Sequence, residues 1–213
     1  MASDISPKAE VSPKAKIGDN CKIYPFVYIE DDVVIGDKNL IRENVVINRA
    51  THAGGRTVIG SFNFLMEGAH ISHDTKVGDH CVFGYGTKIA GDCEIGNGVI
   101  FSSSVIENAG TRVGEGAMVQ AGTTFSKDVP PYIIAGGKPI AYGGPNNTMM
   151  TAYGIDEKIQ KHIANAYRLV FHGQNSVFDA VIQINAQVPD GPQIRNIVNF
   201  INATKAGIIG KMK

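Results

Sequence analysis

The segment KVGDHCVFGYGTKIAGDCEIGNGVIF, residues 76–101, places a large apolar residue at every sixth position. The same step runs from Ile5 to Phe125, and only Ala53 and Glu107 break it. Side chains repeat about every 3.6 residues on a helix and every 2 on a strand, so neither element explains a period of six. A chain that turns a corner after each six-residue segment does explain it. The pattern therefore predicts a β-solenoid, with one large side chain per segment pointing at a central axis.

The position four residues after each large residue is mostly small or β-branched, as a narrow packed column requires. All three cysteines, Cys21, Cys81 and Cys93, fall at this position, which favours packing over a metal site or a nucleophile. Glycines that follow the large residue recur mostly 18 residues apart, so that one coil holds three six-residue segments. One interval is six residues longer. The surplus lies in residues 48–57, NRATHAGGRT, which we expect to form an external loop.

The six-residue register ends after Lys127. Prolines in residues 128–139 favour an extended exit segment. Beyond it, apolar spacing predicts helices over residues 155–173, 176–186 and 192–209. We therefore expect a β-helical domain over residues 1–145 and an α-helical domain over residues 146–213.

Charge and composition exclude several classes of function. The chain has 213 residues, 20 basic and 20 acidic, and a formal net charge of zero. A nucleic-acid partner is not expected, because such proteins carry an excess of Lys and Arg. No apolar run reaches the roughly 18 residues that a membrane span needs, and the N-terminal residues lack the apolar core of a signal peptide. We expect a cytoplasmic protein.

The segment AHISHD, residues 69–74, holds the residues best suited to catalysis. The register places His73 and Asp74 at an exposed corner and His70 just before the inward Ile71. A carboxylate beside an imidazole can fix its tautomer and stabilise its protonated form, as a general base requires. Adjacent His and Asp also occur by chance, so the pattern alone does not decide between a catalytic pair and an accidental one. His52, in the external loop, is a further candidate for contact with a substrate.

These residues also carry a family resemblance. IRENVVINRAT (41–51), Leu65-Met66, AHISHD (69–74), KIAG (88–91), DVPPYIIA (128–135) and NAYRLVF (165–171) resemble the acyl carrier protein-dependent UDP-N-acetylglucosamine O-acyltransferases of lipid A synthesis. The resemblance implies a left-handed parallel β-helix of about six to seven coils with a C-terminal α-helical domain. It further implies a homotrimer whose active sites lie in clefts between adjacent β-helices.

When the roles of the family's residues are carried over by position, the resemblance implies that His73 is the general base that deprotonates a sugar hydroxyl. Asp74 would orient the His73 imidazole. His70 would line the cleft, and the Gly91 N–H would donate to the oxyanion of the tetrahedral intermediate. The acyl group would pass directly from the thioester of acyl carrier protein, a co-substrate, to the nucleotide sugar. Neither a cofactor nor a metal is needed.

The resemblance also implies substrate-binding residues, and some of them differ from the family pattern. Asn146 matches an asparagine that contacts the nucleotide, Asn108 replaces a family histidine, and Ala121, with Met118 nearby, replaces a glycine that lets the acyl tail extend. Asp92 replaces a family histidine one coil above the base. A basic family pair falls on Ala152 and Tyr153, a family glutamate falls on Thr148, and about two N-terminal coils are missing.

Three other interpretations compete with this one, and the residues disfavour the last two. The same mechanism could serve a different nucleotide-linked amino sugar, which these departures favour. A zinc-dependent carbonic anhydrase would need a third histidine beside His70 and His73, and Lys88, Gly91, Ile106 and Ala109 stand where it is expected. A non-catalytic assembly subunit would have no need of His73 and Asp74 together. The sequence does not specify the length of the acyl chain, nor whether the acyl donor is a carrier protein or coenzyme A.

Overall fold

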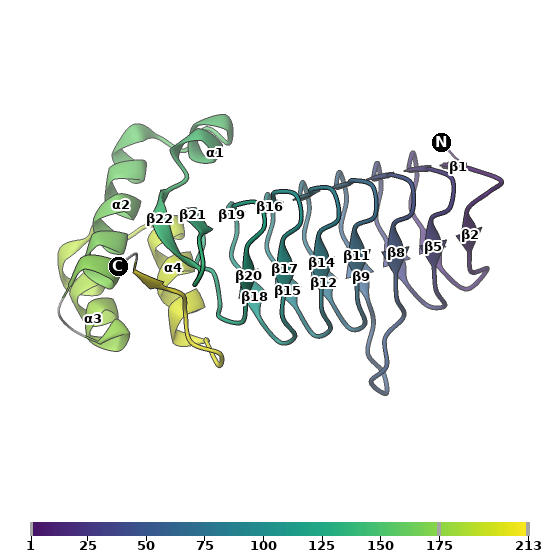
Figure 1. Ribbon diagram of the computed structural model, residues 1–213. Helices are drawn as coiled ribbons and strands as arrows, with labels where there is room; N and C mark the ends of the chain where they lie inside the picture. The colour runs from purple at the N-terminus through teal and green to yellow at the C-terminus, as the bar shows by residue number, and fades with distance from the viewer. Residues whose placement is uncertain (1, 174–175, 212–213) are drawn as a thin grey trace.

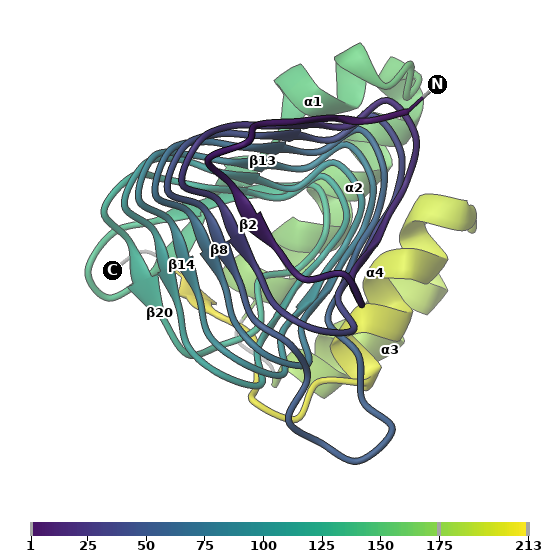
Figure 2. The ribbon, with the colours of Figure 1, turned by 90° about the vertical axis from the view of Figure 1, so that its right-hand side faces the viewer.

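The computed structural model describes residues 2–173 and 176–211. A triangular column of stacked coils runs from the N-terminus and is closed at its far end by helices (Figures 1 and 2). The column has about seven turns, which confirms the predicted left-handed parallel β-helix with a C-terminal helical region.

Each coil contributes one two-residue strand to each of three faces, here called A, B and C. Face A contains β1 (Asp4–Ile5), β4 (Lys22–Ile23), β7 (Leu40–Ile41), β10 (Phe64–Leu65), β13 (Val82–Phe83), β16 (Ile100–Phe101) and β19 (Met118–Val119). Face B contains β2 (Glu10–Val11), β5 (Tyr28–Ile29), β8 (Val46–Ile47), β11 (His70–Ile71), β14 (Lys88–Ile89), β17 (Ile106–Glu107) and β20 (Thr124–Phe125). Face C contains β3 (Lys16–Ile17), β6 (Val34–Ile35), β9 (Val58–Ile59), β12 (Lys76–Val77), β15 (Glu94–Ile95) and β18 (Arg112–Val113).

Parallel pairing holds the coils in register. On face B, Ile71 stacks between Ile47 and Ile89, one coil to either side. The second residue of each strand points inward, and the small residue four positions later fills the space beside it, as at the fully buried Thr75. The three cysteines are likewise buried and free, which confirms their predicted packing role.

The external loop leaves the column between β8 and β9 (Figure 1). It carries Ala53 into solvent, which explains why this position interrupts the apolar repeat. Glu107, the other interruption, points inward and is completely buried. The expected external loop accounts for Ala53, whereas the sequence alone does not show that Glu107 is buried.

The exit segment is extended, as predicted: β21 (Ile133–Gly136) continues face A and pairs with β22 (Ala141–Pro145). Within the described residues, four helices follow: α1 (Asn147–Ala152), α2 (Glu157–His172), α3 (Val177–Gln187) and α4 (Pro192–Asn202). Residues 1, 212 and 213 of the expected domains, and residues 174–175, lie outside the described part.

The predicted third helix is too long. It ends at Asn202 instead of residue 209. The chain then turns back to the column: the Thr204 hydroxyl donates to Asp128 Oδ2 at 2.7 Å, and Gly207 takes a positive φ of 73°. There the Ile209 N–H donates to the Asp128 carbonyl at 3.0 Å, and β23 (Gly210–Lys211) pairs with β22. Helix α1, capped by the Asn146 side chain, was not predicted. No helix in the described residues is long and apolar enough to cross a membrane.

Candidate active site

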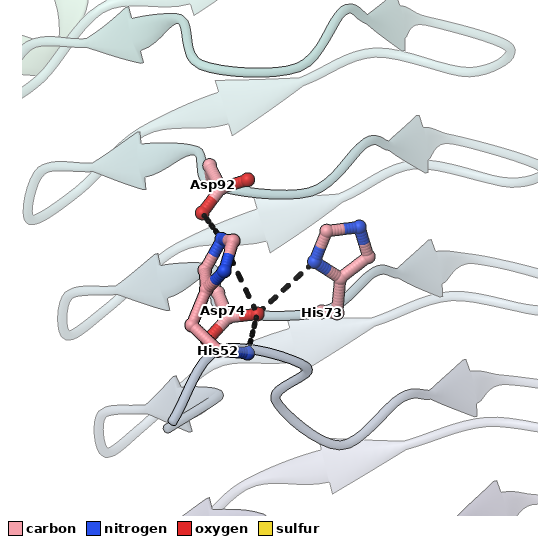
Figure 3. A group of neighbouring side chains, drawn as sticks. All are labelled: His52, His73, Asp74 and Asp92. Carbon is pink, nitrogen blue, oxygen red and sulfur yellow. Dashed lines mark hydrogen bonds and ion pairs between the residues drawn. The ribbon is translucent and has the colours of Figure 1, made fainter. Parts of the chain in front are cut away.

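The corner between faces B and C, after β11, carries the predicted catalytic pair. His73 Nδ1 lies 3.1 Å from Asp74 Oδ2 (Figure 3). Asp74 adopts a left-handed φ of 58°, a conformation that aspartate tolerates better than most residues. The His73 side chain remains 36% exposed, whereas that of Asp74 is only 6% exposed. The structure therefore brings the predicted base and its predicted orienting carboxylate together, but it corrects the expectation that Asp74 is exposed.

The external loop is what covers Asp74. Asp74 Oδ2 accepts from the Thr51 N–H at 2.8 Å, the Thr51 hydroxyl at 3.0 Å and the His52 N–H at 3.3 Å. Burial alone would raise the pKa of this carboxyl, but the hydrogen bonds from Thr51, His73 and His52 outweigh it and bring the pKa down to about 2. Asp74 is thus an anion at neutral pH, as a partner for an imidazolium must be.

Two glycines allow the close packing of this site. A Cβ on Gly55 would lie 2.1 Å from Asp74 Oδ1, and one on Gly91 would lie 2.3 Å from His73 Cε1. Real Cβ atoms do not come this close to their neighbours, so a side chain at either position would push the catalytic pair aside. Gly91 is required beneath the His73 ring for steric reasons, apart from any role of its N–H.

The Gly91 N–H has no hydrogen-bond acceptor among the described residues. Gly91 itself is buried, and a buried N–H without a partner is unfavourable. An oxygen that develops negative charge in front of it would supply that partner. The position beside His73 fits the role of oxyanion donor that the resemblance implies.

His52 and Asp92 extend the network across the corner. His52 Nε2 lies 2.8 Å from Asp92 Oδ1 and 3.9 Å from Asp74 Oδ2, so that the ring bridges two coils (Figure 3). Its ring meets that of His73 edge-on, with centroids 6.1 Å apart. From the sequence, Asp92 is only a departure from the family pattern. In the structure it has an imidazole partner 40 residues away.

The four side chains His52, His73, Asp74 and Asp92 offer ligand atoms within 4.8 Å of one another, a donor set that could hold a transition metal. It differs from the set weighed for a zinc enzyme, because His70 is not part of it. Asp74 Oδ2 already accepts three hydrogen bonds from the external loop in addition to the His73 contact. We interpret the cluster as a hydrogen-bonded network on that ground.

His70 has a separate partner. Its Nε2 lies 2.6 Å from Asn48 Oδ1, at the start of the external loop. Burial, and the nearby charge of Lys88, lower the pKa of His70 below 6.5, so its ring is neutral at neutral pH. With the amide oxygen as acceptor, Nε2 carries the proton. His70 thus faces outward from β11 on face B, held by the loop that also holds Asp74.

Of the four predicted substrate-binding residues, one lies at this corner and three lie elsewhere. Asn108 is exposed at the same corner, further along the column, while Met118 lies on face A and Ala121 at the corner between faces A and B. Asn146 is buried; its Nδ2 donates to the Gly116 carbonyl at 3.0 Å, and its Oδ1 caps helix α1. Within one chain, therefore, the amide of Asn146 has a structural role, and Met118 and Ala121 lie apart from His73.

Sequence reasoning missed Thr51 and Asn48 as parts of the site. Both lie in the external loop and in segment 41–51, which carries the family resemblance, but neither signal gives them a role. An insertion that leaves the column next to a candidate base could have pointed to them.

Two family models match the chain. The model for domain 2 of UDP-N-acetylglucosamine O-acyltransferase matches residues 128–209, and the bacterial transferase hexapeptide model matches residues 14–49 and 56–91. Among curated proteins, acyl-[acyl-carrier-protein]–UDP-N-acetylglucosamine O-acyltransferases of Myxococcus xanthus and Xanthomonas axonopodis pv. citri are 31% and 36% identical to it. Both alignments cover 84% of this chain, and they cover 70% and 68% of the respective relatives.

Solved structures give the same result. A UDP-N-acetylglucosamine acyltransferase from Bacteroides fragilis is similar at a TM-score of 0.85 and 39% identity, covering 96% of this chain and 99% of that one. The enzyme from Acinetobacter baumannii has a TM-score of 0.80 and 26% identity, with 98% of each chain covered. Both solved structures are thus matched over nearly their whole length.

Proposed function

Because the chain belongs to the family of acyl carrier protein-dependent UDP-N-acetylglucosamine O-acyltransferases, we propose that it transfers an acyl group from acyl carrier protein to a hydroxyl of UDP-N-acetylglucosamine. This reaction belongs to lipid A synthesis. The observation that carries the proposal is the His73–Asp74 pair, packed over Gly91 at one corner of the column. The names of the curated relatives favour this acceptor over another nucleotide-linked amino sugar.

The mechanism uses one imidazole as both base and acid. Asp74 accepts from Nδ1–H of His73, which leaves Nε2 free to take the proton of the sugar hydroxyl. The hydroxyl oxygen attacks the thioester carbonyl carbon, and the resulting oxyanion accepts from the Gly91 N–H, a contact that can contribute about 3 kcal/mol. Collapse of the intermediate breaks the carbon–sulfur bond. The thiolate then takes the proton from the imidazolium, giving the ester and the free thiol.

The network supports this cycle because it fixes the imidazole before substrate arrives. Asp74 keeps its charge through the loop hydrogen bonds, and its carboxylate stabilises the imidazolium formed during the reaction. No covalent enzyme intermediate is needed, since the two substrates react directly.

The homotrimer implied by the resemblance is part of the proposal. Face B exposes apolar side chains on its outer side: Tyr28 is 39% exposed and Ile106 is 43% exposed, on either side of His70. Covering this surface with a second copy of the chain would remove apolar area from water. It would also place the corner that carries His73 beside another column.

The decisive test is acyl transfer by His73→Gln, assayed with acyl carrier protein thioester and UDP-N-acetylglucosamine. The amide keeps the size of the ring but cannot cycle a proton, so kcat should fall by about 10²- to 10⁴-fold. His80→Ala, at an exposed corner between faces C and A, is the matched control and should keep wild-type activity. Wild-type turnover by the His73 variant would reject the assignment.

A further inference from the structure

A cavity of about 420 Å³ lies beside the active site, between the external loop and the N-terminal coils. Its ionisable lining residues are Lys14, Lys16, Asp32, Arg49, His52 and Arg56, and we call it the basic cavity. Four of these side chains are permanent cations at neutral pH and one is a carboxylate. In a chain whose formal net charge is zero, this is a local concentration of positive charge.

Most of that charge is not neutralised. Lys14 Nζ is paired with Asp31 Oδ2 at 2.9 Å, but among the described residues Lys16, Arg49 and Arg56 have no side-chain ion pair. On the other side of Arg49, the adjoining groove carries Glu10, Glu30 and Asp31. Negative ligands are therefore attracted to the basic cavity and repelled from the groove next to it.

The cavity is rigidly connected to the catalytic corner. Arg49 and Arg56 stand near the two ends of the external loop, and the Arg49 N–H donates to Glu30 Oε2 at 2.8 Å. Between them, Thr51 is bonded to Asp74, and His52 lines the cavity while lying 3.9 Å from Asp74 Oδ2. A group held in the cavity would thus be adjacent to the position where the sugar hydroxyl meets His73.

We propose that the basic cavity binds a phosphate group of one of the two substrates, an inference that rests on the proposed function. A nucleotide sugar carries a diphosphate, and the pantetheine arm of a carrier protein carries a phosphodiester. Guanidinium groups bind phosphate oxygens in a bidentate manner, and Arg49 and Arg56 are free to do so. The cavity would supply cations that the chain lacks at Ala152 and Tyr153, where a basic pair stands in the family pattern.

The test uses Arg49→Gln, Arg56→Gln and the double variant of the full chain, with Arg168→Gln, an exposed arginine on α2, as the matched control. Calorimetry measures the Kd of UDP-N-acetylglucosamine and of uridine, and steady-state assays measure the KM of the acyl carrier protein thioester. Thermal unfolding confirms that each variant is folded.

If the diphosphate is the ligand, the double variant should bind UDP-N-acetylglucosamine at least about tenfold more weakly, while uridine binding does not change. If the pantetheine phosphodiester is the ligand, the nucleotide Kd stays constant and the KM of the carrier thioester rises by a similar factor. Unchanged values for both substrates would overturn the proposal.

A failure of the proposed function can be told apart from a failure of the phosphate site. His73→Gln should retain the wild-type Kd values and lose only turnover. If wild-type protein binds the nucleotide sugar through Arg49 and Arg56 but transfers no acyl group, the phosphate site stands and the reaction is wrong.

Discussion

Glu107 is the only charged residue among the large inward positions of the repeat, and its side chain is completely buried. Oε1 accepts from the Thr111 hydroxyl at 3.0 Å, whereas Oε2 has no hydrogen-bond partner in the part of the chain that the structure describes. Burial raises the pKa of this carboxyl well above 4.5, so the folded chain holds it as the neutral acid. An ionised carboxylate at this position would cost far more than the neutral acid.

The stability of the column should therefore decrease as pH rises. Above pH 4.5 the unfolded chain releases the Glu107 proton while the folded chain keeps it, so the unfolded state is favoured. Over that range the loss approaches about 1.4 kcal/mol per pH unit, until the folded carboxyl also ionises. Glu107→Gln keeps the shape and the Thr111 bond but cannot titrate.

Denaturant unfolding of both proteins from pH 5 to pH 8, at one protein concentration, measures this difference. The free energy of unfolding should decline more steeply for wild type than for Glu107→Gln. Glu94→Gln, an exposed position on face C, serves as control and should follow wild type. Parallel curves for wild type and Glu107→Gln would contradict a neutral buried acid.

The external loop is the element that organises the site. It donates three hydrogen bonds to Asp74 through Thr51 and His52, and the His52–Asp92 contact ties it to the next coil. Asp92 also follows Gly91, and its N–H donates to the His73 carbonyl at 3.0 Å. The His52–Asp92 bond should thus position the base and the oxyanion donor relative to each other.

A double-mutant cycle on His52 and Asp92 tests this positioning role. Asp92→Ala and His52→Ala should each lower kcat roughly 10- to 100-fold through misplacement of the base. The double variant should be no worse than either single one, because both remove the same bond. Asp92→Asn keeps an oxygen acceptor for His52 and should restore most of kcat. Additive losses, or a failure of Asp92→Asn to restore activity, would exclude the bond as the cause.

The repeat predicts the column in detail. The adjacency of His73 and Asp74 makes their contact possible, and the family resemblance implies it. The path of the external loop is different. Its residues have no inward register, so nothing local specifies that His52 returns to Asp92, 40 residues away. Similarly, Ile208 and Ile209 continue a helical pattern, yet they pack on the end of the column because Gly207 turns the chain.

At the scale of the whole molecule, the proposed site would be shared between chains. His73 lies at the corner between faces B and C, whereas Met118 lies on face A and Ala121 at the corner between faces A and B. Side chains on different faces of one rigid column cannot approach one another. If Met118 and Ala121 contact the acyl tail, they must reach it from a second chain, as the proposed cleft between columns requires.

Activity should consequently depend on assembly. Dilution of a shared-site oligomer separates the subunits by mass action, so turnover per chain should fall as the proposed trimer dissociates. Mass photometry and initial rates, measured over the same dilution series, give the trimer fraction and the activity together. Substitution of Ile106 by aspartate on face B should move both curves to higher protein concentration, because a charge would be buried at the proposed contact. Full turnover per chain by a protein that is monomeric at every concentration would show that one column holds a complete site.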